Sequence, residues 1–443
     1  MENRKKRKVL IGLIIFTTLL LIGTIAFSLI RDQDSYRYFT GMGSSFDLSP
    51  DEQHYIFSYY LDGQENIYTA KVDGTEVTKL TESPSARHHT PKFSSDGTNI
   101  LFLSKNEEGI NTLNLANTDG SEQRALTSDE MHVSEAVFSK TDDAIYYIAT
   151  LAEDFKKAEG ETQEGFDLFV VDLQEGKSKQ LTDRDYFSME GLSLSQDGTK
   201  IYYSLFDGSR ERITAYSLED GLEKAAPGSN RLPVDSYYFS YSPDGSKIAF
   251  TTISEESRDS SLYKYELFLL DTDKDEINRL TNLESSVVQP LFFNDQNQIA
   301  FLENTNWPTD PADHHLKVID TETEEIESIT FDIPNPNSGH WAMKTIDLFA
   351  NGYTVAFLYT VLIGLIITFL SLKQSRRKTY LPAIISLILA SLVLISSFVV
   401  AGVYDPWTGI GLGMIAIVLF GCTLILFGYA FVLNLFRRKQ WRI

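Results

Sequence analysis

Histidines and carboxylates recur just ahead of apolar, strand-like runs, and these are the residues whose types and spacing could do chemistry. Neutral imidazoles beside carboxylates can hold a metal ion or a cationic ligand. The set lacks the His-x-x-x-His spacing of a helical metal site, so solvated or packed loop histidines are the competing interpretation. The candidate ligand-binding residues are His88, His89, His132, Glu135, Glu190, Asp235, Tyr237 and Gln289.

A repeat in the sequence must position these residues. Residues 241–250 read YSPDGSKIAF and residues 93–102 read FSSDGTNILF. A turn of Asp-Gly type followed by an alternating apolar run is the signature of a β-hairpin. Looser copies complete a series of aligned aspartates, spaced by 45 to 55 residues: Asp51, Asp96, Asp142, Asp197, Asp244 and Asp295.

Each repeat unit also closes in the same way, on a strand that ends in Leu-Thr or a close variant. These endings lie at residues 80–81, 126–127, 181–182, 280–281 and 329–330. Four strands per unit at this period predict the blades of a β-propeller, and six units predict six blades. The inner-strand starts then ring one mouth of the channel, where the candidate residues lie. We expect no strand from residues 36–39 in closure, since the sixth unit supplies its own fourth strand.

The hairpin with its Leu-Thr ending resembles the repeat of TolB-type β-propellers over residues 44–331. Two units depart from the pattern, with Asp142-Asp143 and Asp295-Gln296 in place of Asp-Gly. The resemblance implies the propeller fold. It implies no single function, because this repeat serves binding proteins, periplasmic assembly factors and peptidase accessory domains.

Apolar stretches at both ends of the chain predict α-helical membrane spans, one N-terminal and three C-terminal. Residues 9–30 form an uninterrupted apolar run, and three more lie near residues 353–372, 380–403 and 410–436. Each is long enough to cross a bilayer. A cleaved signal peptide is the alternative for the first run, with Ala26-Phe27-Ser28 as a possible cleavage site. We expect an uncleaved anchor because the run is long.

Basic clusters before the first span, between the second and third, and after the fourth predict the topology. The positive-inside rule places all three clusters, and so both chain ends, in the cytoplasm, with the propeller outside the cell membrane. The predicted organisation is a basic stub and anchor at residues 1–30, a propeller with flanking linkers at 31–345, and a three-span region at 346–443.

The charge distribution indicates which classes of partner the chain can bind. The chain carries a net charge of −22, and residues 31–345 hold 58 acidic against 26 basic side chains. Such a surface repels nucleic acid and anionic lipid, and favours counterions or a cationic protein or peptide partner. The competing interpretation is that the charge only keeps the domain soluble outside the cytoplasm. The single cysteine, Cys422, lies in the last span. The absence of a disulfide framework is typical of a bacterial exported domain.

Motifs for catalysis or cofactors are weak. The sequence contains no Gly-x-Ser-x-Gly motif of an α/β-hydrolase. Residues 271–275 imitate the start of an EF-hand loop, but Glu276 and Asn282 stand where glycine and a bidentate glutamate are required. We therefore expect an exposed turn there and no metal, cofactor or catalytic residue.

The sequence thus favours a membrane-anchored, extracytoplasmic propeller that is not an enzyme. It would act as a binding, scaffold or sensing module for a protein, peptide or envelope ligand. The alternative is a propeller-class hydrolase or lyase with metal-assisted chemistry at the channel mouth. The charged insertion at residues 150–165 lies beside that mouth, and we expect it to be a mobile loop.

Overall fold

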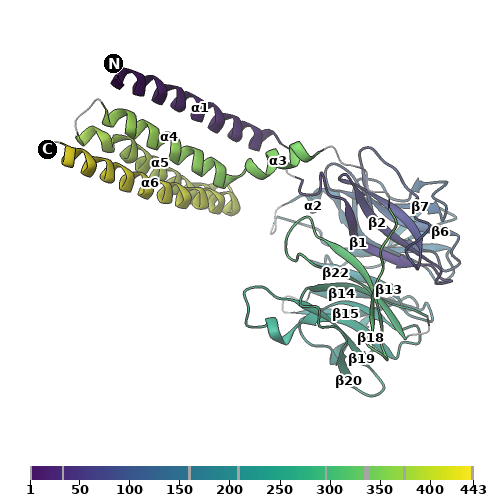
Figure 1. Cartoon of the computed structure of the whole chain (residues 1–443). Coiled ribbons are helices and arrows are strands. Elements are labelled where there is room, and N and C mark those ends of the chain that lie inside the picture. Colours follow the sequence, from purple (N-terminus) through teal and green to yellow (C-terminus); the bar gives the residue numbers. More distant parts are fainter. Residues whose placement is uncertain are drawn as a thin grey trace. The chain divides into compact units, whose positions relative to one another are not determined.

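The computed structural model describes residues 2–31, 34–157, 161–206, 210–294, 297–333, 340–372 and 376–440. The chain forms two compact units, and each is described here by itself (Figure 1). A helical unit comprises Met1–Gln33 and Gly339–Ile443, and an all-β unit comprises Asp34–Ser338.

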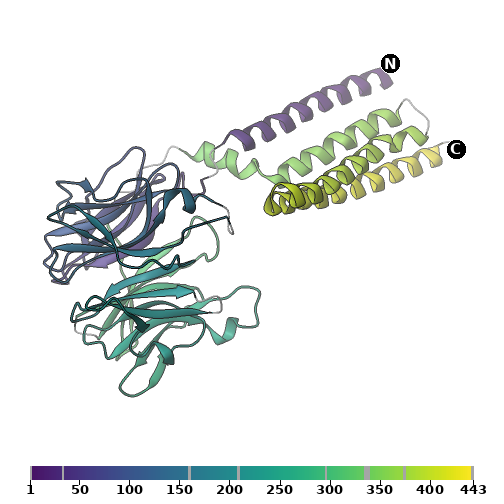
Figure 2. The same cartoon turned by 180° about the vertical axis from the view of Figure 1, so that it is seen from behind.

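The helical unit contains α1 (Glu2–Ile30), α3 (Trp341–Phe349), α4 (Gly352–Ser371), α5 (Leu381–Val403) and α6 (Pro406–Gln440). Within the described residues, α1, α4, α5 and α6 are long and apolar enough to cross a membrane. Helices α4, α5 and α6 share a core that includes Ile367, Ala383 and Leu426. Small residues in such a core let helix backbones approach closely. Helix α1 lies alongside α4 (Figures 1 and 2).

The all-β unit is built from consecutive antiparallel meanders of four strands, numbered here in chain order among the described residues. The first is β1 (Gly41–Leu48), β2 (His54–Leu61), β3 (Gln64–Lys71) and β4 (Thr78–Lys79). The second is β5 (Arg87–Phe93), β6 (Asn99–Lys105), β7 (Asn111–Asn117) and β8 (Arg124–Ala125). The third is β9 (Met131–Phe138), β10 (Ala144–Leu151), β11 (Asp167–Asp172) and β12 (Ser178–Gln180), with the short helix α2 (Ala152–Phe155) after β10.

The remaining strands repeat this arrangement. The fourth meander is β13 (Met189–Leu194), β14 (Lys200–Phe206), β15 (Glu211–Ser217) and β16 (Glu223–Ala225). The fifth is β17 (Ser236–Tyr241), β18 (Lys247–Ile253), β19 (Tyr265–Asp271) and β20 (Glu276–Arg279). The sixth is β21 (Ser286–Phe292), β22 (Gln298–Asn304), β23 (His314–Asp320) and β24 (Ile326–Ser328). The propeller-like, all-β class expected from the repeat is therefore confirmed.

The repeated aspartates hold the hairpin turns. In the second meander the Ser94 hydroxyl donates to Asp96 Oδ1 at 2.7 Å, and the Asn99 amide donates back to Ser94 Oγ at 2.9 Å. Gly97 follows with φ +71°, a left-handed conformation that glycine adopts without steric cost. Asp hydrogen-bonding within its own turn accounts for the motif without any ligand.

The third meander corrects the alignment of these aspartates. Asp143, rather than Asp142, accepts the hydrogen bond from the Ser139 hydroxyl, at 2.8 Å. Asp142 instead accepts two backbone amides of the neighbouring turn, from Ser95 and Asp96, each at 2.9 Å. The extra aspartate therefore ties the second and third meanders together. The expected turn at Asp295 lies outside the described residues.

The Leu-Thr endings have a common physical cause. The Thr81 hydroxyl accepts the amide of Ile67, at 3.0 Å. Three further threonines accept the equivalent strand amide at 2.9 Å: Thr127, Thr182 and Thr281. The threonine satisfies a third-strand amide at the point where the short outer strand has ended, and a buried amide without an acceptor would be costly.

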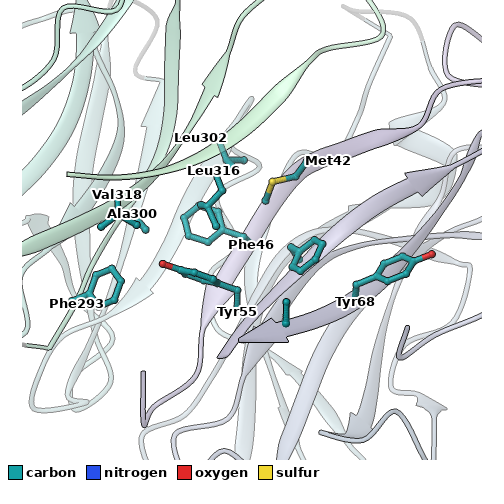
Figure 3. Packing of buried hydrophobic residues seen from close by; sticks show 11 residues of the cluster. Met42, Phe46, Tyr55, Tyr68, Phe293, Ala300, Leu302, Leu316 and Val318 are labelled. Atoms are coloured by element: carbon teal, nitrogen blue, oxygen red, sulfur yellow. The ribbon is translucent and has the colours of Figure 1, made fainter. Parts of the chain in front are cut away.

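Apolar cores join neighbouring meanders. Ile56 and Ile100 belong to one core between the first and second meanders, and similar cores follow along the chain. The sixth meander packs in turn against the first. Figure 3 shows this last core, where Phe46 and Tyr55 meet Leu302 and Leu316. Burying these side chains is the main favourable contribution to the fold.

The chain after β24 completes the contact between the sixth and first meanders. The Phe331 ring stacks on Phe57 with centroids 3.9 Å apart, and the Asp332 amide donates to the Gly74 carbonyl at 3.2 Å. Residues 36–38 form turns, and neither they nor Phe39 belong to a strand. Tyr36 nevertheless reaches the sixth meander, because its hydroxyl accepts the Ala312 amide at 3.1 Å.

Candidate functional site

The first strand of every meander is interrupted by a β-bulge. Register shifts occur between these strands and their partners in all six described meanders. Four of the bulges place a residue in the left-handed region: Thr90 (φ 51°), Gly191 (φ 69°), Tyr238 (φ 43°) and Gln289 (φ 54°). Bulges re-aim side chains, and such backbone strain in non-glycine residues is common at binding sites.

The bulged strands line a cavity of about 290 Å³. Its walls carry three glutamates, Glu135, Glu190 and Glu211, together with Tyr238 and Gln289. A second cavity of about 370 Å³ adjoins it between the fourth and fifth meanders. The two share wall residues, which are Ser204, Glu211, Tyr237, Tyr238 and Phe239. The combined space lies in the size range of small-ligand sites.

Glu135 joins the third meander to the fourth. Its two carboxylate oxygens accept the backbone amides of Gly191, at 2.9 Å, and Leu192, at 2.6 Å. A Cβ at Gly191 would lie 2.9 Å from the Phe239 ring, so the left-handed bulge also requires glycine on steric grounds. Burial raises the pKa of Glu135, and the two amides oppose that shift by stabilising the anion.

Glu190 and Glu211 add negative charge to the same cavity. Burial raises the pKa of Glu190, and the like charges of Glu135 and Glu211 raise it further. Glu211 Oε2 accepts a hydrogen bond from the Ser204 hydroxyl at 2.7 Å. Lys92 also lines the cavity, but its Nζ lies 3.5 Å from Asp47 Oδ1 in an ion pair. Three carboxylates against one paired lysine give the 290 Å³ cavity an excess of negative charge, which favours a cation, whereas Arg210, Arg212 and Lys224 line the adjoining cavity.

Aromatic rings complete the walls. Tyr237, Tyr238 and Phe239 follow one another in β17, and the bulge lets all three face the cavities. Burial, and then the negative charges of Glu190 and Glu135, raise the pKa of Tyr238 to about 12. The phenol therefore stays neutral at pH 7. Aromatic faces beside carboxylates suit an organic ammonium group, which they attract through cation–π interactions.

The three histidines of the candidate set lie elsewhere. His89 and His132 meet at the junction of the second and third meanders, whereas His88 faces the core between the first and second. His89 Nε2 lies 3.2 Å from the side-chain Oδ1 of Asn111, and the backbone N–H of Asn111 donates to His132 Nδ1 at 3.3 Å. The His132 ring stacks on Phe155, with centroids 3.5 Å apart and an interplanar angle of 8°. His88 packs against Phe102, centroid to centroid at 5.0 Å. Burial lowers the pKa of each histidine to about 4, so all three are neutral at pH 7.

The structure therefore divides the predicted set. Four residues come together as cavity walls: Glu135, Glu190, Tyr237 and Gln289. The histidines and Asp235 are not among the residues that line either cavity. The Asp235 carbonyl accepts a hydrogen bond from the Thr252 hydroxyl at 2.8 Å. A ligand-binding role for the eight residues stays a prediction.

Sequence reasoning missed Glu211 and Tyr238. Glu211 opens the third strand of its meander, whereas the predicted residues lie in or just ahead of the first strands. Tyr238 was hidden by alternation, because a bulge moves a neighbouring side chain to the other face of a strand. A comparison of third-strand starts between repeats would have found Glu211.

The metal-like motifs do not assemble into a site. Among the described residues, no group of three or more His, Cys, Asp or Glu side chains is arranged to hold a metal ion. Asp271, the first residue of the EF-hand-like run, accepts the amides of Asp273 at 3.1 Å and Lys274 at 3.0 Å, within the turn between β19 and β20. In the 150–165 insertion, α2 places Phe155 on His132, and residues 158–160 lie outside the described residues.

Part of this chain is similar in sequence to proteins described as peptidases. The family model of the dipeptidyl peptidase IV (DPP IV) N-terminal region matches residues 48–209. The uncharacterized peptidase YuxL of Bacillus subtilis is 25% identical over 201 residues, which cover 44% of this chain and 26% of that protein. The match thus spans about a quarter of that relative's length.

Solved structures with similar folds have low sequence identity to this chain. TolB from Acinetobacter baumannii has a TM-score of 0.46 at 16% identity, covering 64% of this chain and 62% of that one. A prolyl endopeptidase structure has a TM-score of 0.49 at 11% identity, covering 72% of this chain and 54% of that one.

One expectation from the sequence is corrected by these comparisons. The prediction that the chain is not an enzyme is wrong, because the matching family model and the curated relative both point to a peptidase. The sequence argument set a peptidase aside because the Gly-x-Ser-x-Gly motif is missing, although peptidase accessory domains share this repeat.

Proposed function

We propose that this chain acts in peptide hydrolysis as a membrane-held propeller that binds the cationic amino end of a peptide substrate. The observation that carries the proposal is the arrangement of Glu135, Glu190 and Glu211 around one cavity. In addition to burial, the negative charges of Glu135 and Glu211 raise the pKa of Glu190 because the carboxylates repel one another. A bound ammonium group would reduce this repulsion. An attraction between opposite charges is strongest where water is partly excluded.

An organic ammonium fits this site better than a metal ion. No group of three or more His, Cys, Asp or Glu side chains in the described part of the chain is arranged to hold a metal ion, and the backbone amides of Gly191 and Leu192 fix the Glu135 carboxylate in place. Glu190 and Glu211 remain to face a ligand. Tyr237 and Tyr238 supply ring faces, which favour an ammonium carried on an organic chain. The adjoining cavity of about 370 Å³ leaves room for the residues that follow the amino group.

The family match supports the choice of a peptide over other amines. The DPP IV N-terminal region matches residues 48–209, which include the third meander and Glu190. The described cavity accounts for substrate recognition, and the hydrolytic step is assigned to no described residue. Cleavage is therefore to be measured on the whole chain in its membrane.

The proposal places the propeller outside the cell, on four spans with both chain ends in the cytoplasm. The basic clusters of the sequence support this topology through the positive-inside rule. The proposal also treats the meanders as six blades of a closed ring. The cores between successive meanders, and the core shared by the sixth and the first, support that arrangement.

The experiment compares two peptides on the full chain in detergent micelles at pH 7. Isothermal titration calorimetry measures the affinity of tetra-alanine amide with a free amino end and of its acetylated form. We expect acetylation to weaken binding at least ~10-fold, since removing one charge–charge contact in a partly buried site costs about 1.4 kcal/mol or more. Glu190→Gln should reduce that difference.

The control is Glu175→Gln, which removes an exposed glutamate from the turn between β11 and β12. It should leave both affinities unchanged. Equal binding of the free and acetylated peptides by the unaltered chain would refute the proposed amine site. Cleavage of a fluorogenic peptide by membranes that contain the chain, compared with membranes that lack it, tests the link to hydrolysis.

A further inference from the structure

A strip of aromatic rings leads away from the acidic cavity across the fifth and sixth meanders. Tyr237 meets Tyr265 edge to face, with ring centroids 5.7 Å apart, and Tyr265 meets Trp307 in the same way at 6.0 Å. Tyr237 and Trp307 are 39% and 41% exposed. Large aromatic surfaces left partly open beside a cavity commonly mark binding sites.

We propose that this strip, formed by Tyr237, Tyr265 and Trp307, selects peptides with an apolar or aromatic side chain within the first four residues. The inference rests on the proposed function, because the amino end must lie in the acidic cavity for the strip to receive those residues. Tyr237 belongs both to the cavity wall and to the strip, so the two surfaces are continuous.

The length of the strip fits a short extended segment. Its two ring-to-ring steps of 5.7 and 6.0 Å correspond to about three residues of extended chain, at ~3.3 Å per residue. A peptide whose amino group lies among the glutamates would therefore carry its second to fourth side chains past Tyr265 and Trp307. Extended peptides commonly dock on grooves lined by aromatic rings.

The loop that carries Trp307 is held in place before any ligand binds. The Asn306 side chain donates to the Pro311 carbonyl at 2.9 Å and accepts the Asp313 amide at 2.8 Å. The Thr309 amide donates to the Asn306 carbonyl at 3.0 Å. A loop ordered by its own hydrogen bonds loses little entropy on binding, so its exposed ring can contribute more to affinity.

Asp235 adds a preference against acidic peptides. Asp235 lies two residues before Tyr237 in the chain. Burial raises the pKa of Tyr265, the middle ring of the strip, and the negative charge of Asp235 raises it further. The same charge acts on Tyr237. An acidic side chain laid on the strip would be repelled, whereas a neutral apolar one would not.

The test uses the full chain in detergent micelles and three tetrapeptide amides with free amino ends. One is tetra-alanine, and the others carry tryptophan or glutamate at the third position. We expect the tryptophan peptide to bind ~10-fold more tightly than tetra-alanine, and the glutamate peptide several-fold more weakly. Trp307→Ala should remove the gain from tryptophan and leave the affinity for tetra-alanine within about twofold.

The matched control is Ile277→Ala, because Ile277 is also 41% exposed but lies on the outer strand β20. It should preserve the tryptophan preference. A preference that survives Trp307→Ala would overturn the strip while leaving the amine site intact. Tetra-alanine amide and its acetylated form are measured on the unaltered chain in parallel. If these two bind equally, the amine site is refuted, whatever the effect of Trp307→Ala.

A second copy of the chain is the other possible occupant of the strip. Light scattering of the micelle complex distinguishes this case. If Trp307→Ala changes the oligomeric mass but not the peptide preference, the strip is an interface between copies, and the peptide assignment is wrong.

Discussion

Two junctions between neighbouring meanders carry different residue types at equivalent strand positions. One junction is closed by packing, and the other lines cavities. At the junction of the second and third meanders, Asn111 opens β7 and His132 is the second residue of β9. At the junction of the fourth and fifth, Glu211 opens β15 and Tyr237 is the second residue of β17. The first pair is joined by a hydrogen bond from the Asn111 amide and is capped by Phe155. The second pair lines open cavities.

The difference shows what makes a site in this fold. Neutral groups that satisfy one another close the histidine junction, and burial then keeps the imidazoles uncharged. At the other junction the equivalent residues make no such contact and line cavities, and the like charges of Glu135 and Glu211 act on Glu190 there. Candidate chemistry in a repeat protein should therefore be sought where equivalent positions fail to complement each other, and not where titratable residues are most numerous.

The largest expected effect comes from opening the closed junction. His132→Ala removes a ring stacked on Phe155 and leaves the Asn111 amide without its acceptor. We expect the free energy of unfolding to fall by about 3 kcal/mol. Tyr237→Ala, in the open junction, should cost less than about 1 kcal/mol. Thermal unfolding of the full chain in micelles measures both, and equal losses would erase the distinction between the junctions.

A second test concerns Glu65, which matches Asn111 in position because each lies two residues before the third-strand amide that donates to the closing threonine. Glu65 is 4% exposed, and burial raises its pKa to about 7, against opposing hydrogen bonds from Tyr60 and Ser58. Because the folded pKa of Glu65 exceeds the unfolded value of 4.5, the stability that protonated Glu65 contributes is fully present below pH 4.5. This contribution is lost as the pH rises through 7.

Glu65→Gln imitates the protonated side chain and should remove that loss. We expect the variant to be about 2 kcal/mol more stable than the original chain at pH 8, and nearly equal to it at pH 4.5. Melting temperatures measured at both pH values decide the matter. A gain that is the same at both would show that ionisation of Glu65 is not its cause.

The smallest expected effect is at the open junction itself. Glu211→Gln relieves repulsion with Glu190, so we expect stability to rise by about 0.5 kcal/mol. The affinity for tetra-alanine amide should fall about fivefold, since one negative charge is lost. Calorimetry and thermal unfolding of one preparation give both values. A fall in both stability and affinity would indicate that Glu211 has a structural role instead.

Much of the fold could be predicted because the motifs of the repeat make hydrogen bonds to residues close to them in the sequence. The turn aspartates and the Leu-Thr endings each make short-range hydrogen bonds, so their meaning survives without knowledge of tertiary structure. The exchange of roles between Asp142 and Asp143 could not be predicted, since it depends on the turn of the neighbouring meander.

The site was harder to predict than the fold. Whether His132 faces a channel or stacks on Phe155 depends on α2, a helix in the insertion between β10 and β11. The exposure of Tyr238 depends on a bulge with φ 43°, which alternation of residue types cannot reveal. Bulges and insertions thus explain why the fold could be predicted while the predicted set of site residues was incomplete.

The pH dependence of peptide binding tests the central claim most directly, because carboxylates and histidines titrate differently. The affinity of tetra-alanine amide is measured on the full chain between pH 4 and 7, where the peptide amine stays protonated. We expect affinity to rise with pH through a midpoint above 4.5, the ordinary glutamate value, since burial and like charges raise the pKa of Glu190. Glu190→Gln should flatten this profile, and His89→Gln should leave it unchanged. A flat profile in the original chain, or one abolished by His89→Gln, would contradict the assignment of the site to the glutamates.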